Sequence, residues 1–293
     1  MGLLAMAKRS AAPSSSHLSG GAGGKTRSNG GGRRFLRVKG GVAMTLLEEA
    51  KAKLQRIIAQ EGLAGTEPLT VTARQLTPQE AIGDVPGDEW ALLRGKEGLL
   101  QATFRGAVGQ AFTSQPGPFK GTLNEVLALP LTSPFTRAVF VATLNAVLRA
   151  LGRVEGTVHC RNEEPPQCGQ RLAQAVRAEF GPVRLGIIGY QPGIVAGCVA
   201  VFGAERVRVT DLQLENIGQQ KFGVEIWDGA RETERLLRES QVVLATGTTL
   251  INGTLDSLRE EARRTGVPVL FYGTTIAGVA HLCGLRRLCY YAR

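Results

Sequence analysis

Apolar and polar positions alternate with a helical period in residues 45–62, TLLEEAKAKLQRIIAQEG, which predicts an amphipathic helix. Thr45 and Glu48 have capping-box spacing, and Gly62 is a typical helix end. The segment SPFTRAVFVATLNAVLRALG is apolar nearly all round, which predicts a buried helix that starts at Ser133. Between these helices the pattern predicts strands at LTVTARQL, GLLQATF and AVGQAFT and a short helix at GTLNEVLAL.

The pattern changes in the second half, where apolar runs alternate with amphipathic segments. Continuous apolar runs predict buried strands at VRLGIIG, RVRVTD, QVVLAT and VPVLFYG. Helices are predicted at EEPPQCGQRLAQAVRAEF, PGIVAGCVAVFG, ARETERLLRES and NGTLDSLREEARRTG. Repeated αβ units indicate a parallel sheet covered on both faces, with a ligand crevice at the carboxyl ends of the strands.

The fold class is therefore α/β, with three expected parts. Residues 44–152 form a smaller α+β domain, and residues 153–293 form a Rossmann-like domain. Residues 1–43 are rich in Gly and Ser, a composition that predicts a disordered tail. We expect Met44 to be the true start, because a well-formed helix follows it directly.

Charge is concentrated in that tail. The net charge is +10, but residues 1–43 hold eight basic and no acidic residues, which leaves 27 basic and 25 acidic residues elsewhere. Nucleic-acid binding is therefore not expected of the body; an arm that touches nucleic acid or acidic lipid is the alternative interpretation. GRRFLRVKG is followed by no apolar segment, which argues against an export signal.

No apolar run approaches the roughly 20 residues of a membrane span, so no membrane partner is expected. Five cysteines without a secretory signal favour a reducing compartment, and we expect a cytoplasmic protein. A homo-oligomer is compatible with the sequence, which does not identify the oligomeric state.

Two strands end in the same tripeptide, Gly247-Thr248-Thr249 and Gly273-Thr274-Thr275. Strand ends of a parallel sheet meet at one edge, where glycine turns, hydroxyls and helix amides can hold a phosphate or carboxylate. Asn252 adds an amide to the first turn. The alternative is that each threonine simply caps the helix that follows.

A third turn, GIIGYQPG, places Gly189, Tyr190 and Pro192 at the same edge. Asp211 ends the next strand about 20 residues later, where a dinucleotide-binding domain has its ribose-binding acid. The glycine spacing is not that of the dinucleotide fingerprint, and Pro192 removes one amide from the turn. Asp211 as a local cap is the alternative.

Candidate metal ligands gather in TVHCRNEEPPQCG, a polar segment interpreted as a loop with His159, Cys160 and Cys168. Thiolate and imidazole are ligands of zinc, copper, nickel and iron, so we predict a transition-metal site with Cys289 as a distant partner. Cys198 and Cys283 are interpreted as buried hydrophobes, and each of the others has the same alternative. Asn145 either ties its apolar helix to a loop or faces the interdomain cleft.

The segments LNAVL, TVHC…EPPQC, VTDLQLENIG, ATGTTLINGTLD and FYGTTIAG resemble the prokaryotic heavy-metal chelation domain family. The resemblance covers residues 45–293 and implies an enolase N-terminal-like domain, a Rossmann-like domain and a site between them. It implies that this site uses the Gly189–Pro192 turn, Asp211, the Thr248–Asn252 loop and the Gly273–Thr275 loop. The ending RLCYYAR departs from the Pro-Tyr-Gly expected after the cysteine.

Two functions follow from these features. The first is the binding of a transition metal, or of a metal-bearing anionic small molecule, in an interdomain cleft. The second is an enzyme that acts on a nucleotide or phosphorylated small molecule in the same crevice. No Ser-His-Asp order, Walker sequence or pair of acids at a recognisable spacing supports a particular reaction.

Overall fold

The computed structural model describes residues 44–63, 70–85, 87, 90–94 and 97–293. The predictions for residues 1–43 lie outside this range. Ala43–Arg293 forms one compact unit. Among the described residues, no helix has the length and apolar character to cross a membrane.

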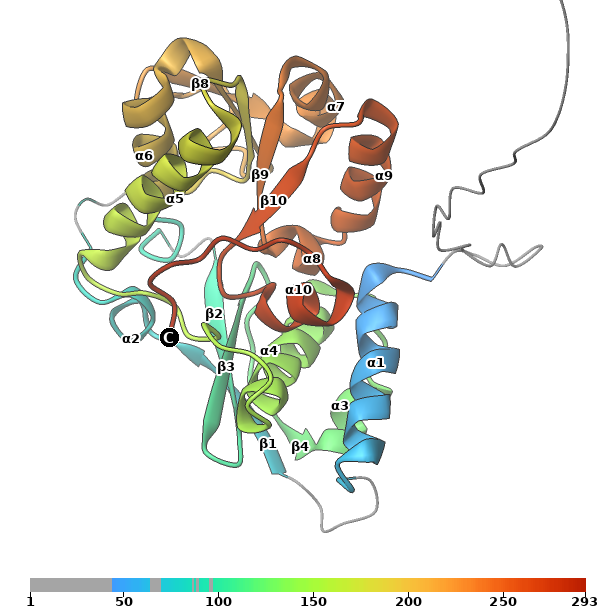
Figure 1. Ribbon diagram of the computed structural model, residues 1–293. Coiled ribbons are helices and arrows are strands. Elements are labelled where there is room, and N and C mark those ends of the chain that lie inside the picture. Colours follow the sequence, from blue (N-terminus) through green and yellow to red (C-terminus); the bar gives the residue numbers. More distant parts are fainter. Residues whose placement is uncertain (1–43, 64–69, 86, 88–89, 95–96) are drawn as a thin grey trace, which may run out of the picture. The chain divides into compact units, whose positions relative to one another are not determined.

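The first part of the unit is a small antiparallel sheet with helices (Figure 1). Its strands have the order β3-β2-β1-β4, and helix α4 packs against β2 and β3. Helix α1 begins after Thr45, which forms the predicted capping box with Glu48. The bounds are α1 Leu46–Gln60, β1 Thr70–Leu76, α2 Pro78–Ile82, β2 Gly98–Phe104, β3 Ala107–Thr113, β4 Phe119–Thr122, α3 Leu123–Ala128 and α4 Pro134–Ala150.

The second part is a six-stranded sheet with helices on both faces (Figure 1). Its bounds are α5 Glu164–Phe180, β5 Leu185–Ile188, α6 Pro192–Phe202, η1 Ala204–Arg206, β6 Val207–Asp211, β7 Gln220–Lys221, β8 Val224–Asp228, α7 Gly229–Glu239, β9 Val242–Thr246, α8 Thr248–Asn252, α9 Leu255–Thr265, β10 Val269–Tyr272 and α10 Ala277–Cys283.

The order of this sheet is β10-β9-β5-β6-β8-β7, and all strands except the edge strand β7 run parallel. Numbered along the chain, the five parallel strands have the spatial order 3-2-1-4-5, which is the Rossmann order without its sixth strand, and the switch point lies between β5 and β9. The predicted α/β fold class is confirmed. Strand β8 and the short elements α2, β4 and β7 were absent from the sequence prediction.

One apolar cluster contains buried residues of α1, α4 and β2 together with residues of α7, β9 and α10. The two parts therefore share a core across the predicted division at residues 152 and 153, and the division itself stays a prediction. A second cluster lies between the parallel sheet and helices α5 and α6. Cys198 is fully buried there, as predicted, and partly buried Cys283 packs on the first cluster.

Helices α5 and α6 touch backbone to backbone. A Cβ atom on Gly169 would lie 1.9 Å from the carbonyl oxygen of Gly193. No side chain fits there, so glycine at Gly169 fixes how closely the two helices approach.

Candidate functional site

A cavity of about 520 Å³ opens at the carboxyl ends of the parallel strands. It is lined by thirteen of the fourteen residues that the sequence analysis selected: His159, Cys160, Cys168, Gly189, Tyr190, Pro192, Asp211, Thr248, Thr249, Asn252, Gly273, Thr275 and Cys289. Thr274 does not line it; its hydroxyl is buried without a hydrogen-bond partner. Sequence segments more than 100 residues apart thus meet at one cavity, and the binding roles of these residues stay predictions.

The turn from β5 into α6 forms one wall. Gly189 has φ +92°, and a Cβ there would lie 2.4 Å from Cγ2 of Thr246, so the chain requires glycine at this point. Helix α6 begins at Pro192 behind Gln191, and no side chain caps it. Gly193 and Ile194 of its first turn line the cavity, so the partly positive end of the helix faces the cavity.

Asp211 organises this turn. Its carboxylate accepts hydrogen bonds from the amides of Tyr190 (2.6 Å) and Gln213 (2.7 Å). Burial raises the pKa of Asp211, and these amides act in the opposite direction. Because the carboxylate already serves the protein's own backbone, Asp211 has little capacity left to bind a ribose.

The threonines do not cap the helices that follow them. Helices α8 and α10 have Gly247 and Ile276 at the N-cap, and no side chain caps either helix. Thr248 instead donates its hydroxyl to the hydroxyl of Thr246 (3.2 Å), and Thr249 donates to the Thr246 carbonyl (2.8 Å). The capping interpretation is therefore wrong for both turns.

The second turn is attached to the neighbouring sheet and helix. Thr275 accepts a hydrogen bond from the amide of Phe112 in β3 (3.0 Å). Asn145 of α4 is fully buried and donates to the carbonyls of Gln110 (3.0 Å), Thr274 (3.2 Å) and Thr275 (3.2 Å). It also accepts from the amide of Gly278 (2.8 Å). Asn145 thus ties its helix to a loop, the first of its two predicted roles.

Three thiols meet at the other wall. Cys168 is hydrogen-bonded to both Cys160 and Cys289. The segment interpreted as a loop is partly helical: Pro165 and Pro166 occupy the first turn of α5, where a missing amide costs nothing, and Cys168 lies in the next turn. The thiols therefore come from a loop, a helix and the C-terminal segment.

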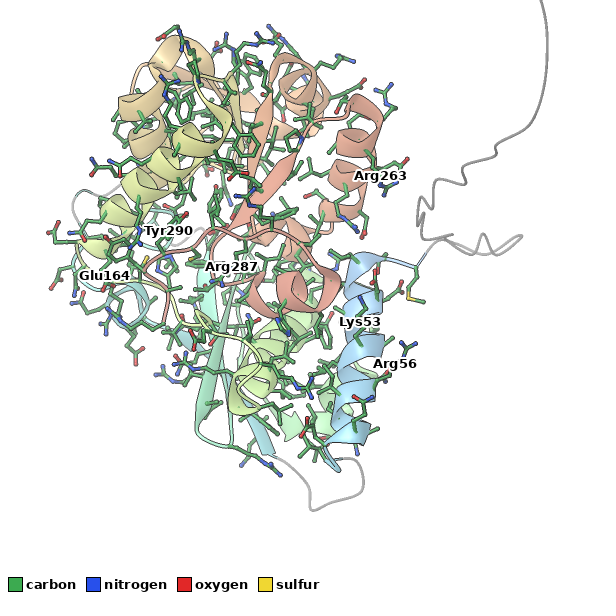
Figure 2. All side chains as sticks on the ribbon, in the orientation of Figure 1. Lys53, Arg56, Glu164, Arg263, Arg287 and Tyr290 are labelled. Carbon is green, nitrogen blue, oxygen red and sulfur yellow. The ribbon has the colours of Figure 1, made fainter. Side chains whose placement is uncertain are left out.

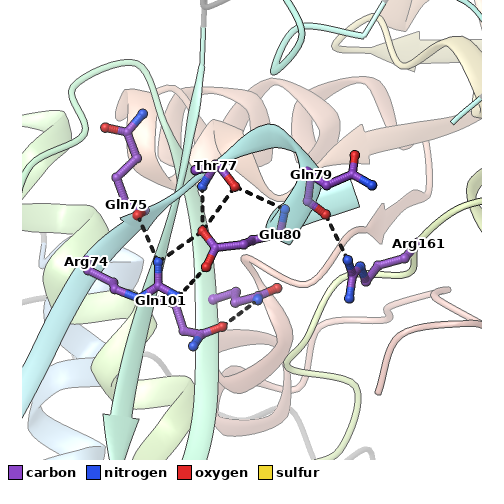
Figure 3. A network of polar contacts seen from close by, with 8 residues as sticks. Arg74, Gln75, Thr77, Gln79, Glu80, Gln101 and Arg161 are labelled. Atoms are coloured by element: carbon purple, nitrogen blue, oxygen red, sulfur yellow. Dashed lines mark hydrogen bonds and ion pairs between the residues drawn. The ribbon is translucent and has the colours of Figure 1, made fainter. Parts of the chain in front are cut away.

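The loop that carries Cys160 is attached to α2. Arg161 donates to the carbonyl of Gln79 (2.8 Å), and the amide of Asn162 donates to the carbonyl of Ile82 (2.8 Å). Helix α2 is held in turn by Arg74, which pairs with Glu80 in the capping box of Thr77 (Figure 3). This polar network positions the first thiol.

The C-terminal segment carries the third thiol. Arg287 donates to the carbonyl of Gly273 (2.8 Å), and Arg171 of α5 lies over the ring of Tyr290 at 4.8 Å. Glu164, labelled in Figure 2 with Arg287 and Tyr290, forms an ion pair with Arg293. Cys289 is therefore held between β10 and α5.

Cys168 and Cys289 are protonated near neutral pH. The hydrogen bond to Cys160 raises the pKa of Cys168, and the hydrogen bond to Cys168, together with burial, raises the pKa of Cys289 well above its usual value. His159 is neutral as well, because burial lowers its pKa to about 4. Its Nδ1–H donates to the carbonyl of Cys160 (2.5 Å), which leaves Nε2 as the nitrogen for a ligand.

A resident metal ion does not fit this arrangement. In the described ranges, no group of three or more His, Cys, Asp or Glu side chains is placed to hold a metal. Thiols must lose their protons before they bind a metal, and here those protons take part in hydrogen bonds between sulfur atoms. The predicted transition-metal cofactor is therefore not matched by a preformed site.

The charge of the cavity is acidic. Its described lining includes Glu97, Asp211, Glu234 and Glu261 and no Lys or Arg. Glu234 and Glu261 pair with Arg264 at 2.9 and 2.7 Å. Glu97 has no hydrogen bond or ion pair within the described part of the chain, and burial raises its pKa to about 7, with a further contribution from Asp211.

Sequence reasoning missed Glu97 and Thr210. Glu97 precedes a strand in a segment without any recognisable motif, and only tertiary folding places it at the cavity. Thr210 lines the cavity with an exposed fraction of 1%, and its hydroxyl has no partner. Its position beside Asp211 at the end of β6 was the available signal.

The chain is similar to two solved structures and, over one segment, to one protein family. A protein of unknown function from the DUF364 family of Pyrococcus horikoshii has a similar structure, with 14% identity, a TM-score of 0.46 and coverage of 79% of this chain and 80% of that one. A DUF364 family protein of unknown function from Desulfitobacterium hafniense gives 15% identity, a TM-score of 0.40 and coverage of 64% and 72%. No curated protein matches. Residues 174–280 match the DUF364 family, described as "Putative heavy-metal chelation", which confirms the family resemblance over this segment.

Proposed function

We propose that the cavity binds a small molecule that presents a thiophilic metal to the cysteines and one anionic group to the glycine–threonine turns. A single observation carries this proposal: Cys160, Cys168 and Cys289 line the same cavity of about 520 Å³ as the β5–α6, Gly247 and Gly273 turns. The description of the family matched by residues 174–280 agrees with a metal-bearing ligand.

In this proposal the metal is cargo that arrives with the ligand. The ligand supplies part of the coordination, so the protein needs only its sulfur atoms and His159 Nε2 to complete it. The thiols release protons as sulfur binds the metal, so metal binding strengthens as pH rises. The anionic group is held by the first-turn amides of α6 and the hydroxyl of Thr248.

Cadmium is a suitable probe of the thiols. Wild-type protein, the double variant Cys160→Ser/Cys168→Ser and the control Cys283→Ser are titrated with Cd²⁺ and followed by sulfur-to-metal charge-transfer absorption. We expect wild type and the control to bind, and the double variant to lose the absorption. Equal Cd²⁺ binding by the double variant would show that the ligand assignment is wrong.

The Rossmann strand order favours the second candidate function, an enzyme acting on a nucleotide or phosphorylated molecule. The cavity's charges weigh against it, because several phosphate charges would face carboxylates without a Lys or Arg among the described lining residues. Thermal-shift screening with nucleotides and adenosyl cofactors separates the two. Stabilisation by a nucleotide that persists in Cys160→Ser/Cys168→Ser would favour the enzyme.

A further inference from the structure

Glu97 differs from every other charged side chain that lines the described part of the cavity. Glu261 pairs with Arg264, Glu234 pairs with Arg264 and Arg238, and the Asp211 carboxylate accepts backbone amides. Glu97 reaches the cavity from the residue before β2 and has no described partner. Among the described residues, Glu97 is therefore the one acid at the cavity without a compensating partner.

That arrangement is costly for the folded protein. A carboxylate withdrawn from water without a partner loses hydration that nothing replaces. The result is a pKa of about 7, so roughly half of the molecules carry a proton on Glu97 at neutral pH. A group kept at such a cost in a cavity wall is a candidate for binding.

The surroundings of Glu97 are acceptors. The charge of Asp211 acts on Glu97, and Thr210, whose hydroxyl is buried without a partner, lines the same cavity. The carboxyl group of Glu97, the nearby negative charge of Asp211 and a hydroxyl oxygen complement a group that is both positively charged and rich in hydrogen-bond donors. A protonated amine has these properties. A bare metal ion does not suit the position, since Asp211 is already occupied by amides.

We propose that this end of the cavity binds a protonated amine of the ligand, with Glu97 as its counter-ion and Thr210 as a hydrogen-bond acceptor. The inference rests on the proposed function, because it concerns the same small molecule. The ligand is then a zwitterion, with an ammonium group at Glu97 and an anionic group at the glycine–threonine turns. Binding of the ammonium group ionises Glu97, so complex formation below pH 7 releases a proton.

The test compares two probes that differ by one amine, 4-aminobutanoate and butanoate. Titration calorimetry is performed with wild type, Glu97→Gln and the matched control Glu261→Gln, whose acid is already paired. We expect wild type and the control to bind the amine about tenfold or more tightly than butanoate, and Glu97→Gln to lose this preference. At about pH 6, calorimetry in two buffers of different ionisation enthalpy should show proton release by wild type and none by Glu97→Gln.

The proposal is overturned if wild type has no preference for the amine up to the solubility limit of the probes. It is equally overturned if Glu97→Gln, checked for folding by circular dichroism, retains the preference. Cd²⁺ titration of Glu97→Gln separates this outcome from failure of the proposed function. The variant should bind Cd²⁺ as wild type does, because Glu97 is not among the thiol-side residues.

Discussion

Two turns of the parallel sheet have the same sequence, Gly-Thr-Thr, and both follow a buried strand. In the turn after β9, Thr248 is half-buried, lines the cavity and shares its hydroxyl with Thr246. In the turn after β10, Thr274 is buried, and Thr275 receives the amide of Phe112 from the other sheet. Both turns line the cavity, but the hydroxyl of Thr248 lies at the cavity wall, whereas the hydroxyl of Thr275 joins the two sheets.

Packing explains the difference. Asn145 of the buried helix α4 holds the second turn through the carbonyls of Thr274 and Thr275. Arg137 of α4 instead donates to the carbonyl of Ile251 (3.1 Å), which lies beyond the threonines of the first turn. A hydroxyl that is used for the fold is not free for a ligand. Because the two turns have the same sequence, the partner of each threonine hydroxyl decides what that hydroxyl does.

The largest effect should come from Asn145→Ala. The substitution leaves three carbonyls and the amide of Gly278 without their partner inside the core, and we expect a loss of about 3–5 kcal/mol in the free energy of unfolding. Urea denaturation measures it. Asn252→Ala, in the exposed end of the first turn, is the control and should change stability by less than about 0.5 kcal/mol. Similar losses in the two variants would remove the contrast between the turns.

Thr275→Val should have the second largest effect on stability. Valine keeps the shape but cannot accept the amide of Phe112, so we expect a loss of about 1–3 kcal/mol. Hydrogen exchange at the Phe112 amide should accelerate along with the loss of stability. Unchanged protection of that amide would show that the hydroxyl does not join the sheets.

Thr274→Val tests the neighbouring position, where we expect no loss of stability. The hydroxyl of Thr274 is buried without a partner, so its replacement by a methyl group should leave stability unchanged or raise it by up to about 1 kcal/mol. The experiment measures the midpoint of urea unfolding, with Thr275→Val as the comparison. A clear loss of stability would mean that the hydroxyl has a partner after all.

Thr248→Val should have the smallest effect on stability. Its hydroxyl bonds only to another side chain at the cavity wall, so we expect a change within about 0.5 kcal/mol. The proposed role predicts instead a severalfold weaker binding of 4-aminobutanoate. If binding is unaffected while stability falls, the first turn serves the fold as the second one does.

Local signals in the sequence explain which elements were predictable. Helix α1 has its capping box and its buried stripe of apolar residues within one segment, and the apolar strands β5, β6, β9 and β10 stand out from their neighbours. Strand β8 has only five residues with alternating burial, and its pairing with β6 depends on tertiary structure. The period of so short a segment does not distinguish a strand from a loop.

The site was predictable to a similar degree. The parallel sheet brings strand ends to one edge, so residues of the three turns could be assigned to a common cavity. The functional state of each group could not be predicted, because it depends on contacts made across the fold. Asp211 is occupied by amides, Cys168 lies in a helix beside two thiols, and the pKa of Glu97 is raised by burial and by the charge of Asp211.

The contact between Gly169 and Gly193 has a consequence for ligand selection. Cys168 precedes Gly169 in α5, and Gly193 belongs to the first turn of α6, so the sulfur end and the amide end of the cavity are mounted on two helices pressed together without intervening side chains. Their spacing cannot widen unless the helices separate. In the proposed function, this contact would fix the distance between the two ends of the bound molecule, and a chemically suitable molecule whose ends are too far apart would be excluded.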